Sequence, residues 1–299
     1  MAHRGVVRRA ALWNSPRVPD RDGPFDDDAI QPVDLLRCDA DRAVAGRDLV
    51  AREEPLEIQL RGVTLAVVMR TPGHDAELVR GFLVTERVVQ RAADIAAIRH
   101  CDVVTDPAAD GNVVNVTLRE GVAVDLESLR RNLFASSSCG VCGKATIDNA
   151  LAVAPPLDDP ARFAAAFFAR AADHLAAQQP VFAHTGGLHG AALFAPTGAL
   201  LVAREDVGRH NAVDKVIGWA LERDRLPLAG HALMVSGRIS FEIAQKALAA
   251  RIPVVAAVSA PTSLAVDLAE RAGMMLVGFV RGARSNVYGA RARWAGARP

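Results

Sequence analysis

Two cysteines separated by two residues are the most reactive groups in the sequence. Cys139 and Cys142 lie in the segment ASSSCGVCGK, residues 135–144. Its serines and glycines predict a mobile loop, so both thiols should be accessible. The thiolate is the nucleophilic form of cysteine, and Arg130, Arg131 and Lys144 are close enough in sequence to favour it. The pattern favours an exposed thiol that carries a transferred group.

Other interpretations of the cysteine pair stay open. A structural zinc site needs four ligands, but the remaining cysteines, Cys38 and Cys101, are isolated and lie upstream. A thioredoxin-like redox pair lies between a strand and a helix, which a serine-rich loop fits poorly. Cysteines in a polar loop are also poor core residues. We expect no metal site, and a zinc-binding or redox-sensing pair in a nucleotide- or cofactor-binding protein is the alternative.

A second group of polar residues follows three apolar runs in the C-terminal half. Each run ends in a small-residue turn that opens a helix, and the turns are Gly208–Asn211, Ser236–Arg238 and Pro261–Ser263. Helix N-termini present free N–H groups and a partial positive charge, so they bind anions readily. Serine, threonine and asparagine are also ordinary helix caps, which makes each turn alone a weak signal. Three such turns at one sheet edge favour a phosphorylated ligand.

A basic stretch follows the last apolar run. The segment FVRGAR, residues 279–284, places Arg281 and Arg284 close to Phe279. Arginine binds phosphate bidentately, and an aromatic ring can stack on a base. A solvated basic tail is the alternative. We expect no nucleic-acid partner, because the rest of the chain offers no aromatic platform.

The elements that must position these residues form two groups. Residues 56–69 alternate around Arg61-Gly62, which predicts a β-hairpin. A helix is expected over 74–89, strands over 95–104 and 112–118, and a short helix over 125–133. In the second half, a helix over 162–178 precedes strands over 199–203, 232–235, 254–258 and 274–280. These strands alternate with helices, which predicts a mostly parallel sheet covered by helices.

Composition limits the class of protein. The 299 residues are 51% hydrophobic and 23% charged, with a formal charge of +1, which is typical of a soluble globular protein. No run of about 18 apolar residues and no secretory h-region are present, so we expect a cytoplasmic protein without a membrane partner. Only three of the 35 basic residues are lysines, namely Lys144, Lys215 and Lys246. A lysine in a site would therefore stand out.

We expect an α/β protein with a smaller N-terminal α+β domain and ordered structure from about Leu49. The expected divisions are a flexible tail over 1–45, the N-terminal domain over 46–134, a mobile C-x-x-C loop over 135–148, the C-terminal domain over 149–290 and a basic tail over 291–299.

Ordered blocks between about residues 50 and 290 resemble the formate dehydrogenase accessory sulfurtransferase family (FdhD). The blocks are MRTPGHDAELVRGFLVTE, SSSCGVCGK, REDVGRHNAVDKVIG, VSGRISFEIAQKA, SAPTSLAVDLAE and GFVRGARSNVY, and all three lysines fall inside them. One departure is Arg87, because the family pattern leads us to expect glycine after Glu86.

The resemblance implies a chemistry that the residues alone do not name. Such proteins accept sulfane sulfur from a cysteine desulfurase as a cysteine persulfide. They pass it to the molybdenum or tungsten bis(molybdopterin guanine dinucleotide) cofactor that formate dehydrogenase requires. Cys139 would carry the persulfide and Cys142 would assist. The stretch that would contact the guanine dinucleotide is Phe279, Val280, Arg281, Gly282, Ala283 and Arg284.

The resemblance also implies a fold and an assembly. The C-terminal domain should be a three-layer domain similar to cytidine deaminase, and the protein should form a homodimer. The cofactor would be a substrate, with no permanently bound cofactor expected. Deaminase chemistry is disfavoured, because an H-x-E motif is needed and His189 is followed by Gly190-Ala191.

Overall fold

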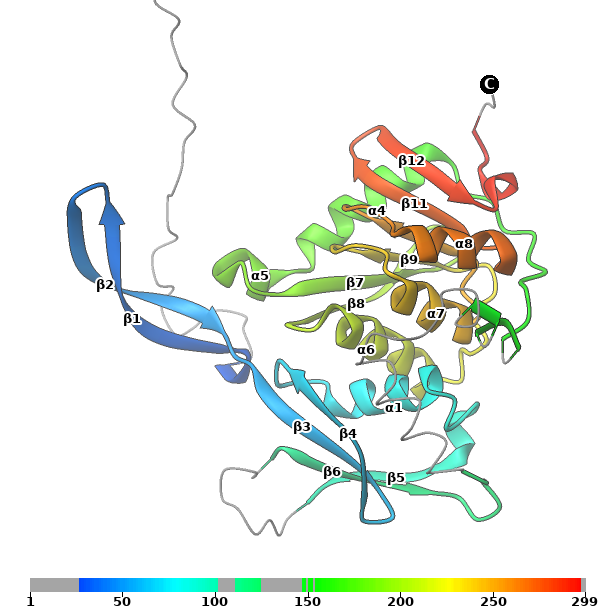
Figure 1. Ribbon diagram of the computed structural model, residues 1–299, viewed down its shortest axis with the longest axis horizontal. Coiled ribbons are helices and arrows are strands. Elements are labelled where there is room, and N and C mark those ends of the chain that lie inside the picture. Colours follow the sequence, from blue (N-terminus) through cyan, green and yellow to red (C-terminus); the bar gives the residue numbers. More distant parts are fainter. Residues whose placement is uncertain (1–26, 102–110, 125–146, 149, 153, 297–299) are drawn as a thin grey trace, which may run out of the picture.

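The protein has a four-stranded sheet, a six-stranded sheet and a projecting two-stranded hairpin (Figure 1). We use the name N-terminal domain for the part built on the four-stranded sheet and C-terminal domain for the part built on the six-stranded sheet, although one hydrophobic core runs through both. The computed structural model describes residues 27–101, 111–124, 147–148, 150–152 and 154–296. Cys139, Cys142 and the helix expected over 125–133 lie outside the described residues.

The N-terminal domain is a four-stranded sheet with one helix packed on it. The strand order is β4-β3-β6-β5. At the turn between β3 and β4, Arg61 and Gly62 have φ angles of 54° and 75°, the geometry of a tight hairpin turn. The expected hairpin and helix are confirmed. The elements are β3 (Glu54–Leu60), β4 (Val63–Arg70), α1 (Asp75–Thr85), β5 (Ile95–His100) and β6 (Val113–Leu118).

The C-terminal domain contains a six-stranded mixed sheet in the order β12-β11-β10-β9-β7-β8. Its strands are β7 (His189–Phe194), β8 (Leu200–Asp206), β9 (Ala232–Val235), β10 (Val254–Ala257), β11 (Met275–Arg281) and β12 (Arg284–Gly289). Our expectation of a mostly parallel sheet was wrong, because three of these five pairings are antiparallel. The sequence interpretation missed β7 and β12. Each joins its hairpin partner through a short turn, and short turns permit only antiparallel pairing.

Helices cover both faces of this sheet, so the domain has three layers (Figure 1). On one face lie α6 (Arg209–Glu222), α7 (Phe241–Ala249) and α8 (Ser263–Ala272). On the other lies α4 (Ala165–Ala177), whose Phe167 and Phe168 pack against alternate residues of β7, β9, β10 and β11. Because both faces are buried, the central strands are apolar throughout and show no alternation.

The hairpin of β1 (Ile30–Asp39) and β2 (Arg42–Ala51) extends away from both domains (Figure 1). We expected a flexible tail to residue 45, so regular structure begins earlier than predicted. The sequence shows no clear alternation of apolar and polar residues here, because the β1–β2 hairpin buries few side chains. Leu36 and Val44 are 66% and 64% exposed. At its base, Ile30 and Ala51 pack beside α5 (Pro180–Thr185), next to Val181.

The two domains meet through a close contact between α1 and α6. A Cβ atom at Gly81 would lie 1.8 Å from the carbonyl oxygen of Asp214, and one at Gly218 would lie 1.8 Å from that of Glu77. Glycine is therefore needed at both positions, because the helix backbones touch. Beside this contact, Arg204 of β8 donates to both carboxylate oxygens of Glu77, at 2.6 and 2.8 Å.

Two of the three lysines are buried at this domain contact. The Lys215 amine lies 2.7 Å from the Asp206 carboxylate and donates to the Thr71 carbonyl at 3.0 Å. The Lys246 amine lies 2.8 Å from the Asp214 carboxylate. Burial disfavours its charge, but the carboxylates of Asp214 and Glu86 outweigh burial and raise the pKa of Lys246. Both lysines therefore contact the N-terminal domain as well as a carboxylate of the C-terminal domain.

Candidate functional site

The three polar turns lie at one edge of the C-terminal sheet. Strand β7 runs antiparallel to both β8 and β9, so β8 points the same way as β9, β10 and β11. The carboxyl ends of these four strands therefore meet at one edge, as the sequence predicted for the first three. Ligands of open α/β sheets bind at such an edge.

The turn after β8 is fixed by a buried carboxylate. Asp206 is fully buried and accepts hydrogen bonds from the Gly208 amide at 2.8 Å and the Asn211 side chain at 2.9 Å. The Asn211 amide also donates to the Met69 carbonyl at 2.7 Å. The Asn211 side-chain amide is therefore already hydrogen-bonded within the protein. Arg209 and His210 are the remaining residues of this turn that could bind a ligand.

Two histidines at this edge are uncharged at neutral pH. Burial, followed by the charges of Arg209 and Lys246, lowers the pKa of His210 to about 4. Burial and Arg209 also lower the pKa of His189. The His189 ring lies beside the second turn, because a Cβ at Gly237 would be 3.3 Å from its Nδ1. Both rings can therefore donate and accept hydrogen bonds to a ligand.

Backbone hydrogen bonds join the second turn, the third turn and the end of β11. The Ile239 amide donates to the Ala260 carbonyl at 3.1 Å, and the Phe279 amide donates to the Ser259 carbonyl at 3.0 Å. A Cβ at Gly278 would lie 2.8 Å from Pro261, so glycine is required where β11 passes the third turn. The FVRGAR stretch is consequently held against the polar turns.

The predicted dinucleotide stretch forms the connection between β11 and β12. Phe279 has a φ of 55°, and its side chain is 42% exposed. Arg281 and Arg284 are paired across the two strands, and both are exposed. Neither has an ion-pair partner within the described residues, so both can accept an anion. Val280 is only 2% exposed and packs beneath α4, so it could contact a ligand only through its backbone.

The first described residues after the cysteine pair, which begin at Ile147, lie at the other end of the sheet; we call them the anchor of the thiol segment, residues 135–146. Ile147 and Ala150, which follow Cys142 in sequence, are buried in the core shared by the two domains. Asp148 pairs with Arg271 in the last turn of α8. Helix α8 begins beside the strand ends, so its last turn lies at the opposite edge of the sheet, away from the β11–β12 connection (Figure 1).

Chain length limits how far the cysteines can reach from this anchor. Cys139 precedes Asp148 by nine residues, which span at most about 32 Å when fully extended. The seven residues of β11 span about 23 Å. The length of nine residues therefore exceeds the length of β11, so a Cys139 thiol tethered at Asp148 is long enough to cross the sheet. Our expectation of a thiol loop beside the strand ends stays a prediction, because Cys139 and Cys142 lie outside the described residues.

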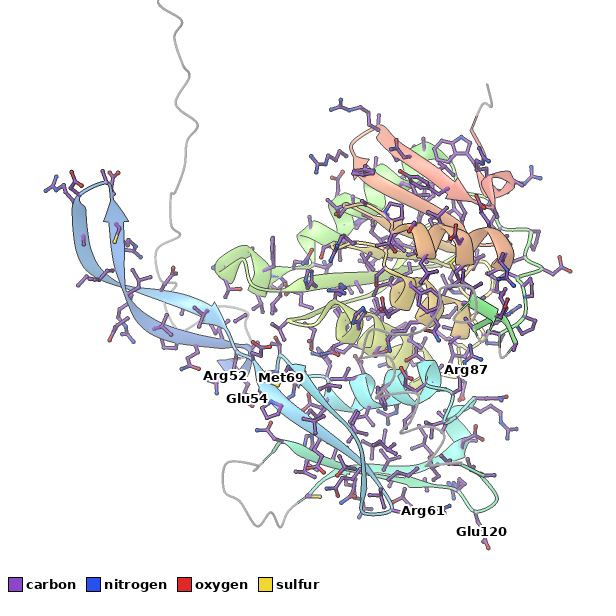
Figure 2. The ribbon with its side chains drawn as sticks, viewed as in Figure 1. Arg52, Glu54, Arg61, Met69, Arg87 and Glu120 are labelled. Atoms are coloured by element: carbon purple, nitrogen blue, oxygen red, sulfur yellow. The ribbon has the colours of Figure 1, made fainter. Side chains whose placement is uncertain are left out.

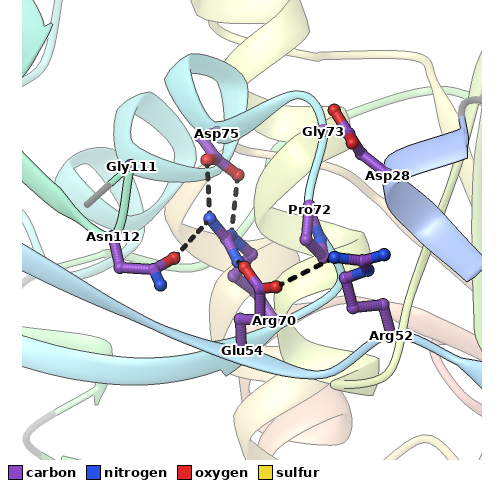
Figure 3. A pocket seen from close by; sticks show the side chains of 9 residues that line it. All are labelled: Asp28, Arg52, Glu54, Arg70, Pro72, Gly73, Asp75, Gly111 and Asn112. Atoms are coloured by element: carbon purple, nitrogen blue, oxygen red, sulfur yellow. Dashed lines mark hydrogen bonds and ion pairs between the residues drawn. The ribbon is translucent and has the colours of Figure 1, made fainter. Parts of the chain in front are cut away.

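A polar pocket of about 290 Å³ lies between the hairpin and the N-terminal sheet (Figure 3). Its buried centre, Arg70, donates to both oxygens of Asp75 and also to Glu54 and Asn112. Every nitrogen of the Arg70 guanidinium therefore donates at least one hydrogen bond within the protein. No sequence pattern predicted the cluster, and its contacts show that Arg70 links β3, β4, α1 and the residue before β6.

The described residues contain no group of three His, Cys, Asp or Glu side chains that could hold a metal ion. Ala191, where deaminase chemistry would need its glutamate, is fully buried in the core. No helix in the described part of the chain is long and apolar enough to cross a membrane.

The fold defines a mixed α/β protein whose strand ends bring together three polar turns and the exposed residues Arg281 and Arg284. Residues 51–295 match the model of the FdhD/NarQ family, and the chain belongs to that family. The sulfur carrier protein FdhD of Mycobacterium tuberculosis is 51% identical over 255 residues, covering 83% of this chain and 92% of the relative. The protein of the same name from Streptomyces coelicolor is 52% identical over 253 residues, covering 83% and 90%.

A solved structure shows the same fold. A candidate formate dehydrogenase accessory protein from Desulfotalea psychrophila superposes with a TM-score of 0.70 at 24% identity, covering 89% of this chain and 99% of that one. The family resemblance that the sequence blocks predicted is confirmed. The roles of Cys139, Cys142 and the FVRGAR stretch stay predictions.

Proposed function

We propose that this protein is a sulfur carrier that supplies sulfur to the molybdenum bis(molybdopterin guanine dinucleotide) cofactor of a formate dehydrogenase. One observation carries the proposal: the family match over residues 51–295 includes the cysteine pair, and relatives at 51% identity are named sulfur carrier proteins. A cysteine desulfurase is the proposed sulfur donor, and Cys139 is the proposed carrier.

Loading is an exchange between persulfides. The Cys139 thiolate attacks the outer sulfur of the donor persulfide, so that a new S–S bond forms at Cys139 while the donor S–S bond breaks. The donor cysteine leaves as a thiolate, and the outer sulfur keeps its proton. This step involves no net oxidation, and it needs an accessible thiolate, which favours a polar segment near basic side chains.

Delivery as sulfide needs two electrons, and Cys142 can supply them. Its thiolate attacks Cys139 Sγ, which forms a Cys139–Cys142 disulfide and releases the outer sulfur as hydrosulfide toward the metal centre. An external thiol must then reduce the disulfide before the next cycle. In this scheme, Cys142 is the reductant that releases the sulfur from Cys139.

The strand ends are the proposed docking surface for the cofactor, which is a substrate here. Arg281 and Arg284 are exposed and lack carboxylate partners within the described residues, so they suit a pyrophosphate. The exposed ring of Phe279 suits a guanine. Neutral His189 and His210 can hydrogen-bond to the ligand without competing with the arginines for phosphate.

Mass spectrometry after incubation with a cysteine desulfurase and cysteine tests the proposal. We expect one added, reductant-labile sulfur on the peptide that contains Cys139 and Cys142. Cys139→Ala should abolish this addition and the activation of formate dehydrogenase, while Cys142→Ala should still load. Unmodified thiols together with co-purified zinc would instead support metal binding by the pair.

A further inference from the structure

The end of β4 and the residues that follow it, 69–73, lie between the polar pocket and the turn after β8. Toward the pocket, Arg70 and Pro72 contribute to the lining (Figure 3). Toward the turn, the Met69 carbonyl accepts a hydrogen bond from the Asn211 side chain at 2.7 Å. This short segment of the N-terminal domain is therefore in direct contact with the sheet edge that we propose as the docking surface.

The segment is held in place on its pocket side. The Arg70 guanidinium is buried and donates to two carboxylates and one amide, all from the N-terminal domain. Two residues further on, the ring of Pro72 fixes the φ angle of the backbone. Thr71 lies between these two residues and is only 3% exposed. It therefore presents its polar groups to the C-terminal domain from a fixed position.

Thr71 makes three hydrogen bonds across the contact between the domains. Its amide donates to the Asp206 carboxylate at 3.3 Å, and its carbonyl accepts from the Lys215 amine at 3.0 Å. Its hydroxyl accepts from the Val207 amide at 3.2 Å. The first two bonds use the backbone of Thr71 and do not depend on its side chain. The bond from Val207 is the one that requires a hydroxyl at this position.

The bond from Val207 fixes the start of the polar turn. Val207 follows the last residue of β8, and α6 begins two residues later, at Arg209. Only Gly208 separates them, so a shift of Val207 would carry over to Arg209 and His210. Each of these two side chains has a buried nitrogen without a hydrogen-bond partner within the described residues. A ligand oxygen can satisfy such nitrogens, provided that the turn holds them at the right place.

We infer that Thr71 is a positioning residue for binding of the phosphorylated ligand: its hydroxyl holds the Val207 amide and thereby places Arg209 and His210 at the strand ends. This inference rests on the proposed function, because it takes the strand ends as the docking surface. Groups that are held in place before binding lose less conformational entropy when the ligand arrives. The N-terminal domain thereby contributes to the affinity for the cofactor through a buried residue.

The test measures binding of guanosine diphosphate to the full-length protein by titration calorimetry. Thr71→Val keeps the shape of the side chain and removes the acceptor for the Val207 amide. Thr85→Val is the matched control, because Thr85 is also buried at the domain contact, where its hydroxyl bonds to the C-terminal domain. Thr85 ends helix α1, and Figure 2 shows Arg87, two residues later, at the opposite end of the contact from Met69.

We expect Thr71→Val to weaken the affinity for guanosine diphosphate about threefold to tenfold, the effect of one lost hydrogen bond. Thr71→Ser keeps the hydroxyl and should bind within about twofold of the wild type. Both valine variants should lower the midpoint of chemical denaturation, because each removes a buried hydrogen bond. Only Thr71→Val should also raise amide hydrogen exchange in residues 207–210. A loss of affinity in this variant alone separates positioning from a general loosening of the domain contact.

Unchanged affinity in Thr71→Val would overturn the inference and leave the proposed docking surface standing. An equal loss of affinity in Thr85→Val would also overturn it, because the domain contact as a whole would then be responsible. The same loss in Thr71→Ser would assign the effect to the methyl group instead of the hydroxyl. A wild-type protein that binds no guanosine diphosphate would overturn the docking surface, and the inference with it. Sulfur loading of the wild type tests the carrier role independently.

Discussion

Arg281 and Arg284 are the clearest anion-binding candidates at the scale of single residues. Each is exposed on the β11–β12 connection, and a hydrogen bond to a charged group contributes about 1.5–3 kcal/mol. We expect Arg281→Ala or Arg284→Ala to weaken binding of guanosine diphosphate about tenfold or more, measured by titration calorimetry. Arg99→Ala, at an exposed arginine of β5, should bind as the wild type does. Equal affinity in all three variants would remove this surface from the site.

His210 should make the protein less stable as the pH falls. Its folded pKa of about 4 lies below the ordinary value of 6.5, so between these values the unfolded chain takes up a proton that the folded protein does not. The stabilisation is fully present above about pH 6.5 and is lost as the pH falls toward 4. Because the ring is one-third exposed, we expect a loss of about 1–2 kcal/mol. In denaturant titrations, His210→Gln should reduce the change in the free energy of unfolding between pH 4 and 6.5. The same pH dependence in the variant and the wild type would show that His210 does not cause it.

At the scale of elements, the contact between α1 and α6 depends on Gly81. Helix propensity alone predicts that Gly81→Ala stabilises α1 by about 1 kcal/mol. Packing predicts the opposite sign, because the new Cβ would lie 1.8 Å from the Asp214 carbonyl and the helices would have to separate. We expect a loss of about 3 kcal/mol or more in the free energy of unfolding. A higher melting temperature for Gly81→Ala would show that the helices are not in close contact.

At the scale of the whole molecule, two buried lysines that are paired within the C-terminal domain also bind the N-terminal domain. Lys246 of α7 holds Asp214 of α6 and donates to the Thr85 hydroxyl of α1 at 2.9 Å. We expect Lys246→Met to cost about 3–5 kcal/mol, because it leaves the Asp214 carboxylate buried without its partner. The double variant Lys246→Met/Asp214→Leu should recover much of this loss. A single variant as stable as the wild type, measured by chemical denaturation, would argue against a structural task for this lysine.

Local sequence patterns predicted much of the fold. The Arg61-Gly62 turn, α1, the strands followed by α6, α7 and α8, and the alignment of three polar turns at one edge all follow from short-range periodicity and turn chemistry. The hairpin of β1 and β2 escaped prediction because it buries few side chains. Strands β7 and β12 escaped because their identity depends on the strands that they pair with, which no local window contains.

By itself, the sequence determined the chemistry that is available: a cysteine pair, three turns suited to anions and a basic stretch, each within a few consecutive residues. Tertiary structure decided which of these groups can act together. It buried Val280 and Asn211, made Lys215 and Lys246 into ties between domains, and set the anchor of the thiol segment at the far end of the sheet from Arg281 and Arg284. Side-chain burial and the placement of distant segments depend on contacts between residues far apart in the chain, so they are settled only when the whole core packs.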